Sequence, residues 1–418
     1  DRFELDLPEK GRIRLRVIGG LGRDRYTVAE GHRAVLYDYR SRPSELRGPG
    51  SARTVFADDY ELNTFKPLQP EGRSRQFLPA FGFNPDDGLS LGAAYTLTQL
   101  GFRRNPFTNR HQLRAGYFFA TSGFDIGYSG EFANLFGRWN LEVEARFTSP
   151  NFTRNFFGLG NETPNPDDTL GLDYNRVRTR ILRLAPALRW RGLLGGSFRL
   201  GTSLEHITVE ESDDRFVNTF YQQNGEETTS RFLGVFGAYS YANKNNPAFP
   251  SLGMSTDVSF GFTRRLSGEG GSFGYLIPSL ALDYPLDARR NLVLATRWKA
   301  HFNIGNAWEF YQGAHIGAND GPRSFRNERF TGKTAYYQLT DLRWQFARKK
   351  TGILPVNPGI FAGFDYGRVW FPGAPSRRWH TSYGGGFFAN ALDVFSVNAA
   401  LFHGSEGFRF SFGFGFAF

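Results

Sequence analysis

Hydrophobic and polar residues alternate along most of the chain from about residue 76 onward. In the last twelve residues, phenylalanine occupies every even position from Phe408 to Phe418, and Arg409 and small residues occupy the odd positions. The same two-residue period runs through 88–98 and 139–147. Because successive side chains of a β-strand point to opposite faces, this pattern predicts strands with one apolar and one polar face.

The alternation divides the chain into sixteen predicted strands. They cover residues 76–83, 88–98, 110–121, 123–133, 138–148, 174–191, 196–210, 230–245, 252–266, 271–287, 291–305, 334–347, 353–371, 379–391, 394–403 and 407–418. Short turns such as 285–289 alternate with long loops at 149–173, 211–229 and 306–333. An even number of strands with short turns on one rim and long loops on the other is typical of bacterial membrane barrels. Alternation is poorest in 174–191, where a register change could lie.

A strand whose outer face is only apolar needs either a second sheet or lipid against it. The polar side of 292–304 carries Arg297, Lys299 and His301, which suits a lumen. Aromatic residues make up 17% of the chain, with 44 phenylalanines, yet no stretch reaches the ~18 continuous apolar residues of a membrane helix. We therefore predict an all-β fold in which residues 76–418 form a 16-stranded antiparallel transmembrane β-barrel.

Residues 1–75 have a different pattern, with short alternating runs and a linker-like segment rich in Gly, Pro, Ser and Arg at 41–53. We predict a small periplasmic β segment and linker there. Within it, Gly19, Gly20, Gly22, Asp24 and Tyr26 match one copy of a calcium-binding β-roll turn. A single copy flanked by arginines favours a tight glycine turn over a calcium site.

Charge and rare residues narrow the possible chemistry. The net charge of +10 comes from 50 Lys and Arg against 40 Asp and Glu, spread over strand positions and not gathered in a patch. This argues against nucleic acid and favours an arginine-lined lumen or contact with lipopolysaccharide. The chain has no Cys, and its seven His residues form no metal-ligand spacing, so we predict no metal, no cofactor and no enzymatic activity. The repeated NPDD at 84–87 and 165–168 predicts turns.

The segments 321–346 and 361–371, followed by the terminal Phe418, resemble the BamA-like superfamily of outer-membrane assembly and secretion transporters, also called the bacterial surface antigen family. The segment 156–163 is similar to a loop of the same family. The resemblance implies that the long loop 306–333 folds back into the lumen. It also implies a location in the bacterial outer membrane.

The resemblance places an Arg-Gly-aromatic motif at the tip of that loop. The matching residues are Arg323, Ser324 and Phe325, with Ser in place of Gly, and Arg326 follows. Ser at this position suggests a somewhat different backbone, since Gly alone adopts positive φ without cost. We single out the loop-tip residues Arg323, Ser324, Phe325 and Arg326.

In the family, the tip arginine pairs with acidic residues on two neighbouring strands, which match Asp341 and Asp365. Alternation places both carboxylates on the lumen face, opposite Leu342 and Phe364. A guanidinium on an inserted loop could satisfy both. The other interpretation is that Asp341 and Asp365 are ordinary charges on a solvated wall.

Three further segments, 19–26, 81–92 and 101–107, resemble a Bacteroidetes-type subgroup in which a phosphoesterase-like domain precedes the barrel. The chain itself contains no such catalytic motif, so an enzymatic domain would lie upstream of residue 1. The resemblance also implies a C-terminal signal for barrel insertion, which would comprise Phe414, Phe416 and Phe418.

The resemblance implies a protein insertion or translocation factor that opens at the seam between its first and last strands. Pro79 interrupts the first strand, so we expect that seam to be weakly paired. Outer-membrane lipid and lipopolysaccharide, polypeptide clients and envelope proteins would be the partners. The alternative is a plugged passive channel, or a membrane scaffold that carries a periplasmic or upstream domain. The sequence does not identify the client.

Overall fold

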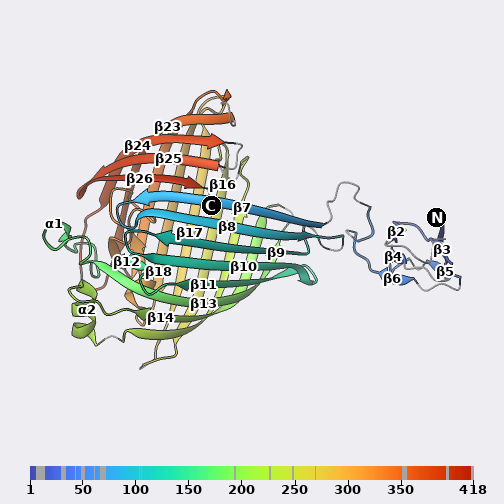
Figure 1. The fold of residues 1–418 in the computed structure, drawn as a ribbon, viewed down its shortest axis with the longest axis horizontal. Coiled ribbons are helices and arrows are strands. Elements are labelled where there is room, and N and C mark those ends of the chain that lie inside the picture. Colours follow the sequence, from blue (N-terminus) through green and yellow to red (C-terminus); the bar gives the residue numbers. More distant parts are fainter. Residues whose placement is uncertain are drawn as a thin grey trace. The chain divides into compact units, whose positions relative to one another are not determined.

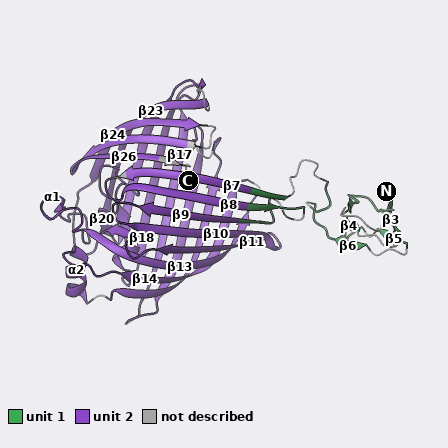
Figure 2. Cartoon of the chain, in the orientation of Figure 1, with its two compact units in different colours: residues 1–74, 98–110 green, residues 75–97, 111–418 purple. Residues whose placement is uncertain are grey.

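The computed structural model describes residues 1–5, 15–29, 34–42, 44–48, 52–60, 62–65, 72–102, 104, 106–192, 194–225, 227–246, 249–268, 270–350, 355–391 and 395–415. The chain divides into two compact units (Figure 2). One unit comprises residues 1–74 and 98–110, and the other comprises residues 75–97 and 111–418.

Sixteen strands close into an antiparallel barrel, which confirms the predicted fold class (Figure 1). Each predicted strand has a counterpart. The barrel strands are β7 (Gly72–Asn84), β8 (Gly88–Leu100), β9 (Asn109–Phe118), β10 (Gly123–Phe136), β11 (Trp139–Thr148), β13 (Arg176–Arg191), β14 (Gly196–Val209), β15 (Thr229–Ala242), β16 (Gly253–Arg265), β17 (Ser272–Pro285), β18 (Leu292–Ile304), β21 (Thr334–Gln345), β23 (Pro355–Trp370), β24 (His380–Ala391), β25 (Phe395–Gly404) and β26 (Gly407–Gly415). The short β12 (Thr153–Asn155) and β22 (Lys349–Lys350) extend the pairing on β13 and β23.

The two-residue period becomes an inner and an outer face. In β13, Leu182 and Leu184 are exposed, whereas Val177 and Thr179 are buried. This strand, the least regular by sequence, keeps one register with β14 from Thr179↔Val209 to Arg191↔Ser197, so the suspected register change is absent from this pair. Exposed large apolar side chains recur on the other barrel strands as well, so the outer face of the barrel carries many apolar side chains.

The last strand follows the same rule. Phe408 and Phe410 are 73% and 45% exposed, and Arg409 between them is only 7% exposed. Arg409 therefore points into the barrel and the two rings point outward. The side chain of Phe414 and the whole of Phe416 and Phe418 lie outside the described residues.

The barrel closes where β26 meets β7, a junction called the seam below; Figure 1 shows dark red β26 beside blue β7. In the described part of the chain, the seam register consists of three pairs, from Phe412↔Phe83 to Phe414↔Phe81. By contrast, β25 and β26 pair continuously from Ser396↔Gly415 to Gly404↔Gly407. The described pairing at the seam is therefore much shorter than at the neighbouring junction.

The connection between β18 and β21, residues 305–333, is called the inserted loop. It contains η1 (Phe310–Gln312), β19 (Ala314–Ile316) and β20 (Phe330–Gly332). Ile316, Phe325 and Phe330 of the loop pack in a buried cluster against inward-facing side chains of β21 and β23, including Tyr337 and Val369. The inserted loop thus lies inside the barrel, as predicted.

Two short helices lie together at one end of the barrel (Figure 1). The helices are α1 (Asp167–Leu170) and α2 (Phe216–Asn224). Val217 and Tyr221 of α2 join Phe156 and Phe310 in a second buried cluster. No helix in the described part of the chain is both long and apolar enough to cross a membrane.

The first unit contains two small parallel sheets. One has the order β1 (Arg2–Leu5), β3 (Arg25–Val28), β5 (Glu45–Arg47), and the other β2 (Leu15–Ile18), β4 (Ala34–Asp38), β6 (Arg53–Phe56). Tyr26, Val28 and Leu36 are buried in the core that the two sheets share. Consecutive strands alternate between the two sheets, so each turn of the chain contributes one strand to each sheet.

The glycine motif of this unit forms a turn. Gly20 has φ of +84°, and a Cβ on Gly19 would lie 2.1 Å from the Tyr26 hydroxyl. That hydroxyl donates to Asp38 Oδ2 at 2.9 Å. Among the described residues, no group of three or more His, Cys, Asp or Glu side chains is arranged to hold a metal ion.

Candidate functional site in the inserted loop

Arg323, at the tip of the inserted loop, binds both aspartates that the sequence singled out. Its Nη2 lies 2.6 Å from Asp341 Oδ1 on β21 and 2.6 Å from Asp365 Oδ1 on β23. Its Nε and backbone N–H both donate to Asp365 Oδ2, at 2.9 Å and 3.0 Å. The guanidinium also lies 4.0 Å from the ring centroid of Phe402. Because Asp365 is fully buried, this fork of charged hydrogen bonds replaces the water that the carboxylate lost.

Small residues make room for the loop tip. A Cβ on Gly363 would lie 2.5 Å from Arg323 Nη2 and 2.8 Å from Asp341 Oδ1. A Cβ on Gly404 would lie 2.1 Å from Ser324 Oγ. Ser324 is not among the described residues with positive φ, so it avoids the conformation that only Gly adopts without cost. The side chain of Ser324 is accommodated by Gly404 of β25, the register partner of Ser382 on β24.

Phe325 fills the space behind the tip. It is 1% exposed, and its ring centroid lies 5.5 Å from that of Phe330 and 5.4 Å from that of His380. Phe330 and His380 stack at 3.6 Å. Such contacts fix the angle at which the tip enters the lumen. The backbone N–H of Ser324 donates to Ser382 Oγ at 2.9 Å, which fastens the tip to β24 as well.

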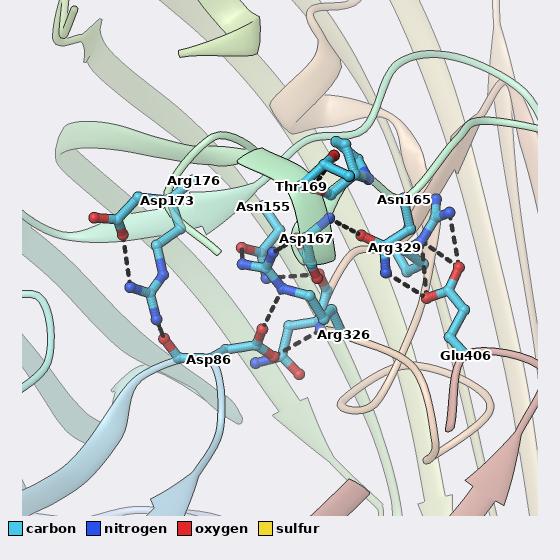
Figure 3. A network of polar contacts seen from close by, with 12 residues as sticks. Asp86, Asn155, Asn165, Asp167, Thr169, Asp173, Arg176, Arg326, Arg329 and Glu406 are labelled. Carbon is cyan, nitrogen blue, oxygen red and sulfur yellow. Dashed lines mark hydrogen bonds and ion pairs between the residues drawn. The ribbon is translucent and has the colours of Figure 1, made fainter. Parts of the chain in front are cut away.

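Arg326 reaches from the loop to three other parts of the chain (Figure 3). Its Nε donates to Asp86 Oδ1 at 2.8 Å, its Nη1 to Asp167 Oδ1 at 2.7 Å, and its Nη2 to Asn155 Oδ1 at 2.7 Å. Asp86 lies in the turn between β7 and β8, and Asp167 begins α1. Arg326 is only 7% exposed, and each of its three guanidinium nitrogens donates to a group of the protein.

Asp86 is in turn shared between the loop and the last strand. Its Oδ2 accepts from Arg409 Nη2 at 2.6 Å and from the backbone N–H of Asn327 at 2.9 Å. Arg176 of β13 donates to its backbone carbonyl. Burial alone would raise the pKa of Asp86, but the guanidinium groups of Arg409 and Arg326 outweigh it and lower that pKa below its ordinary value.

Arg329 fastens the far side of the loop to the turn between β25 and β26 (Figure 3). Its Nε lies 2.8 Å from Glu406 Oε1, and its two terminal nitrogens donate to the hydroxyl and the carbonyl of Thr163, each at 2.8 Å. The guanidinium lies 4.4 Å from the ring centroids of both Phe157 and Phe330. The segment 156–163 therefore packs directly on the inserted loop.

The inserted loop, β12 and β18 together line a cavity of about 550 Å³. Glu328, which has a φ of +52°, binds Arg154 Nε through both carboxylate oxygens at 3.0 Å. His315 Nδ1 lies 3.0 Å from Thr331 Oγ1. Burial lowers the pKa of His315 to about 4, so its imidazole is neutral at physiological pH.

The site is larger than the sequence analysis indicated. Asp86 and Asp167 belong to the two NPDD segments, which were predicted only as turns. Asp86 lies in a turn, but Asp167 begins the short helix α1, and both residues bind Arg326. The occurrence of the same tetrapeptide in two separate loops was the available signal. Glu406 and Arg409 carried no motif, and only the closure of the barrel brings them to the loop.

Comparison with solved structures shows what the fold is similar to. The chain matches a BamA structure from Haemophilus ducreyi lacking POTRA domains 1–3, with a TM-score of 0.60, 14% identity and coverage of 82% of this chain and 70% of the other. It matches CdiB from Escherichia coli with a TM-score of 0.54 and 12% identity over 84% of this chain, and CdiB from Acinetobacter baumannii with 0.51 and 11% over 82%.

The chain spans 63% and 60% of the lengths of those two CdiB chains. The sequence matches no family model and no protein of curated function. At these identities the comparisons define the class of fold, a BamA- and CdiB-like barrel.

Proposed function

We propose that the protein is an outer-membrane factor that inserts or translocates polypeptides by opening the seam between β26 and β7. The observation that carries this proposal is the short described register of the seam, Phe412↔Phe83 to Phe414↔Phe81, in a barrel whose lumen is occupied by a loop. A strand edge with few partners can accept another strand by backbone pairing. A polypeptide client in extended conformation fits that chemistry.

The exterior supports a location in lipid. Exposed large apolar side chains recur on the outer faces of strands around the barrel, including Leu204, Val235, Phe262 and Phe364. Such a belt would be unstable in water and is matched to a hydrocarbon layer. Outer-membrane lipid and lipopolysaccharide are therefore the proposed surroundings, and client chains and envelope proteins are the proposed partners.

A second candidate is a plugged passive channel or a membrane scaffold for a periplasmic or upstream domain. The many bonds that hold the inserted loop favour a permanently closed lumen. The additional parallel-sheet unit suits a scaffold that carries other domains. This candidate differs from the first in requiring no movement at the seam.

The absence of Cys from the chain allows a direct test. The variant F83C/F412C places a cysteine pair on register partners across the seam, and A399C/F412C places one across β25 and β26. Both are reconstituted in vesicles, and the insertion of an unfolded barrel client is followed by its heat-resistant mobility on gels. Oxidation should stop insertion in the first variant, reduction should restore it, and the second variant should be unaffected.

Two results would contradict the proposal. Full insertion by the oxidised seam variant would exclude seam opening. Failure of the unmodified protein to accelerate insertion over empty vesicles, together with an absence of single-channel conductance, would favour the second candidate, a barrel whose lumen stays plugged.

Two finer assignments also remain proposals. Membership of a Bacteroidetes-type subgroup with an upstream phosphoesterase-like domain is supported only by the segments 19–26, 81–92 and 101–107. The aromatic residues Phe414, Phe416 and Phe418 are proposed as the signal for assembly of this barrel itself. Deleting Phe418 should reduce the amount of folded barrel in the outer membrane, and an unchanged amount would contradict that role.

A further inference from the structure

Asp86 lies where three parts of the chain meet. It belongs to the turn after the first barrel strand, it binds Arg326 and Asn327 of the inserted loop, and it binds Arg409 of the last strand. The carboxylate is 3% exposed. The carboxylate accepts from Arg326, Asn327 and Arg409, and Arg176 donates separately to the backbone carbonyl of Asp86. The two carboxylate oxygens are thus used by the loop and by β26. Both oxygens are therefore occupied at once.

The bond to Arg409 continues the seam. Backbone pairing is described from Phe414↔Phe81 to Phe412↔Phe83. Arg409 stands three residues before Phe412, and Asp86 stands three residues after Phe83, so the ion pair lies in line with the same register. A side-chain bond thus joins the two edge strands beyond the described backbone pairs.

The inserted loop holds both hairpins that flank the seam. Arg326 binds Asp86 in the β7–β8 turn, and Arg329 binds Glu406 in the β25–β26 turn at 2.8 Å. Figure 3 shows the two arginines reaching these turns from the same loop. Withdrawal of the loop would remove a guanidinium from each hairpin and would leave Asp86 with fewer donors in a buried position, which is unfavourable.

We propose that Asp86 is the positioning residue that couples the inserted loop to the seam, so that the seam is held closed while the loop is docked. This inference rests on the proposed function in one respect, the assumption that the seam opens. Asp86 acts through Arg326 and Arg409 and contacts no client. The charges are matched, because Asp86 and Asp167 face Arg326 and Arg409.

The test uses the seam pair F83C/F412C as a reporter without any client. The yield of disulfide after brief oxidation of the detergent-solubilised or reconstituted protein measures how often the seam is closed. D86N keeps the shape of the side chain and removes its charge, so the yield should fall roughly fivefold. D86E should recover part of it. D125N, which alters the ion-paired Asp125 on β10, is the matched control and should leave the yield unchanged.

A second set of variants tests whether the inserted loop affects the seam. R326Q alters a residue of the loop and not of the seam strands, yet it should lower the seam yield as D86N does. The double variant D86N/R326Q should fall little further than either single variant, because the two side chains act as one bond. A normal yield in R326Q would show that the loop does not control the seam.

Other outcomes are equally decisive. If the disulfide yield of F83C/F412C is the same with D86N as without it, Asp86 does not position the seam. If D86N lowers trapping of the A399C/F412C pair by the same factor, its effect is a general loosening of the barrel and the inference is wrong. If trapping responds as expected but client insertion is unaffected by locking the seam, the coupling stands and the proposed function fails.

Discussion

The inserted loop is attached to two walls of the barrel that differ in how their strands are joined. Arg323 binds the β21–β23 wall, where the register runs without a break from Thr334↔Trp370 to Gln345↔Gly359. Arg326 binds the turn beside the seam, where the described register covers Phe412↔Phe83 to Phe414↔Phe81. One attachment therefore adds to a wall with a long backbone register, and the other adds to a junction where only three backbone pairs are described.

If the proposed coupling holds, this difference lets one loop act both as a fixed plug on one wall and as a control element at the seam. On the β21–β23 wall, loss of the arginine contact leaves the strands paired but orphans a buried carboxylate. At the seam, loss of the Arg326 contact frees the β7–β8 turn from the loop and leaves Asp86 bonded to Arg409 of β26. We therefore expect changes near Arg323 to affect folding and changes near Arg326 to affect opening.

The largest effect is expected from R323A. Removing the guanidinium leaves Asp365 buried without its main partner, which should cost about 3–5 kcal/mol of unfolding free energy. Urea unfolding in vesicles measures it, and R378A, which alters a half-exposed arginine, is the control. The charge exchange R323D/D365R should yield more folded barrel than either single change. Equal stability of R323A and R378A would contradict the role of Arg323.

The next effect concerns the outer face of the seam strand. F412R would place a charge on the lipid side of β26 and should cost about 2–4 kcal/mol if the residue lies near the bilayer midplane. F412L keeps an apolar side chain and should fold nearly as well as the parent. The two variants are compared by heat-resistant mobility after refolding into lipid. Equal folding of F412R and F412L would place this face away from hydrocarbon.

A pair of glycine substitutions compares the two walls directly. G363A forces a Cβ within 2.5 Å of Arg323 Nη2 and should cost about 1–3 kcal/mol by overpacking. G413A, in the seam, meets nothing closer than 3.7 Å and should be almost neutral. Chemical unfolding of both variants checks this order. A reversed order would mean that the loop tip is loosely packed and the seam is tight.

The smallest effect is that of pH on the loop. The pKa of His315 is lowered to about 4 by burial, whereas an unfolded His titrates near 6.5. The unfolded chain therefore gains a proton first as pH falls, so stability is lost between pH 6.5 and 4, by about 1 kcal/mol at pH 5.5. H315N should flatten this part of the stability profile. If the dependence of stability on pH is unchanged in H315N, groups other than His315 cause the loss of stability in acid.

The strands and their faces could be predicted because a period of two residues has a direct geometric meaning. The Arg323 region could be predicted from a motif. The roles of Asp86 and Asp167 could not, since Asn-Pro-Asp is good turn chemistry whether or not an arginine meets it. The parallel pairing within the two small sheets, β1-β3-β5 and β2-β4-β6, could not be predicted either. Short alternating runs look alike in parallel and antiparallel sheets.

The seam also has a consequence for how the chain folds. The pairing of Phe83 with Phe412 and the bond between Asp86 and Arg409 join residues more than three hundred positions apart, whereas every other junction of the barrel links strands that follow one another along the chain. The entropy lost on closing a segment grows with its length, so this junction has the least favourable loop closure in the molecule. Contacts of such high contact order form late, and the barrel should exist first as an open sheet. We therefore expect the meeting of its two ends to be the last step of barrel assembly.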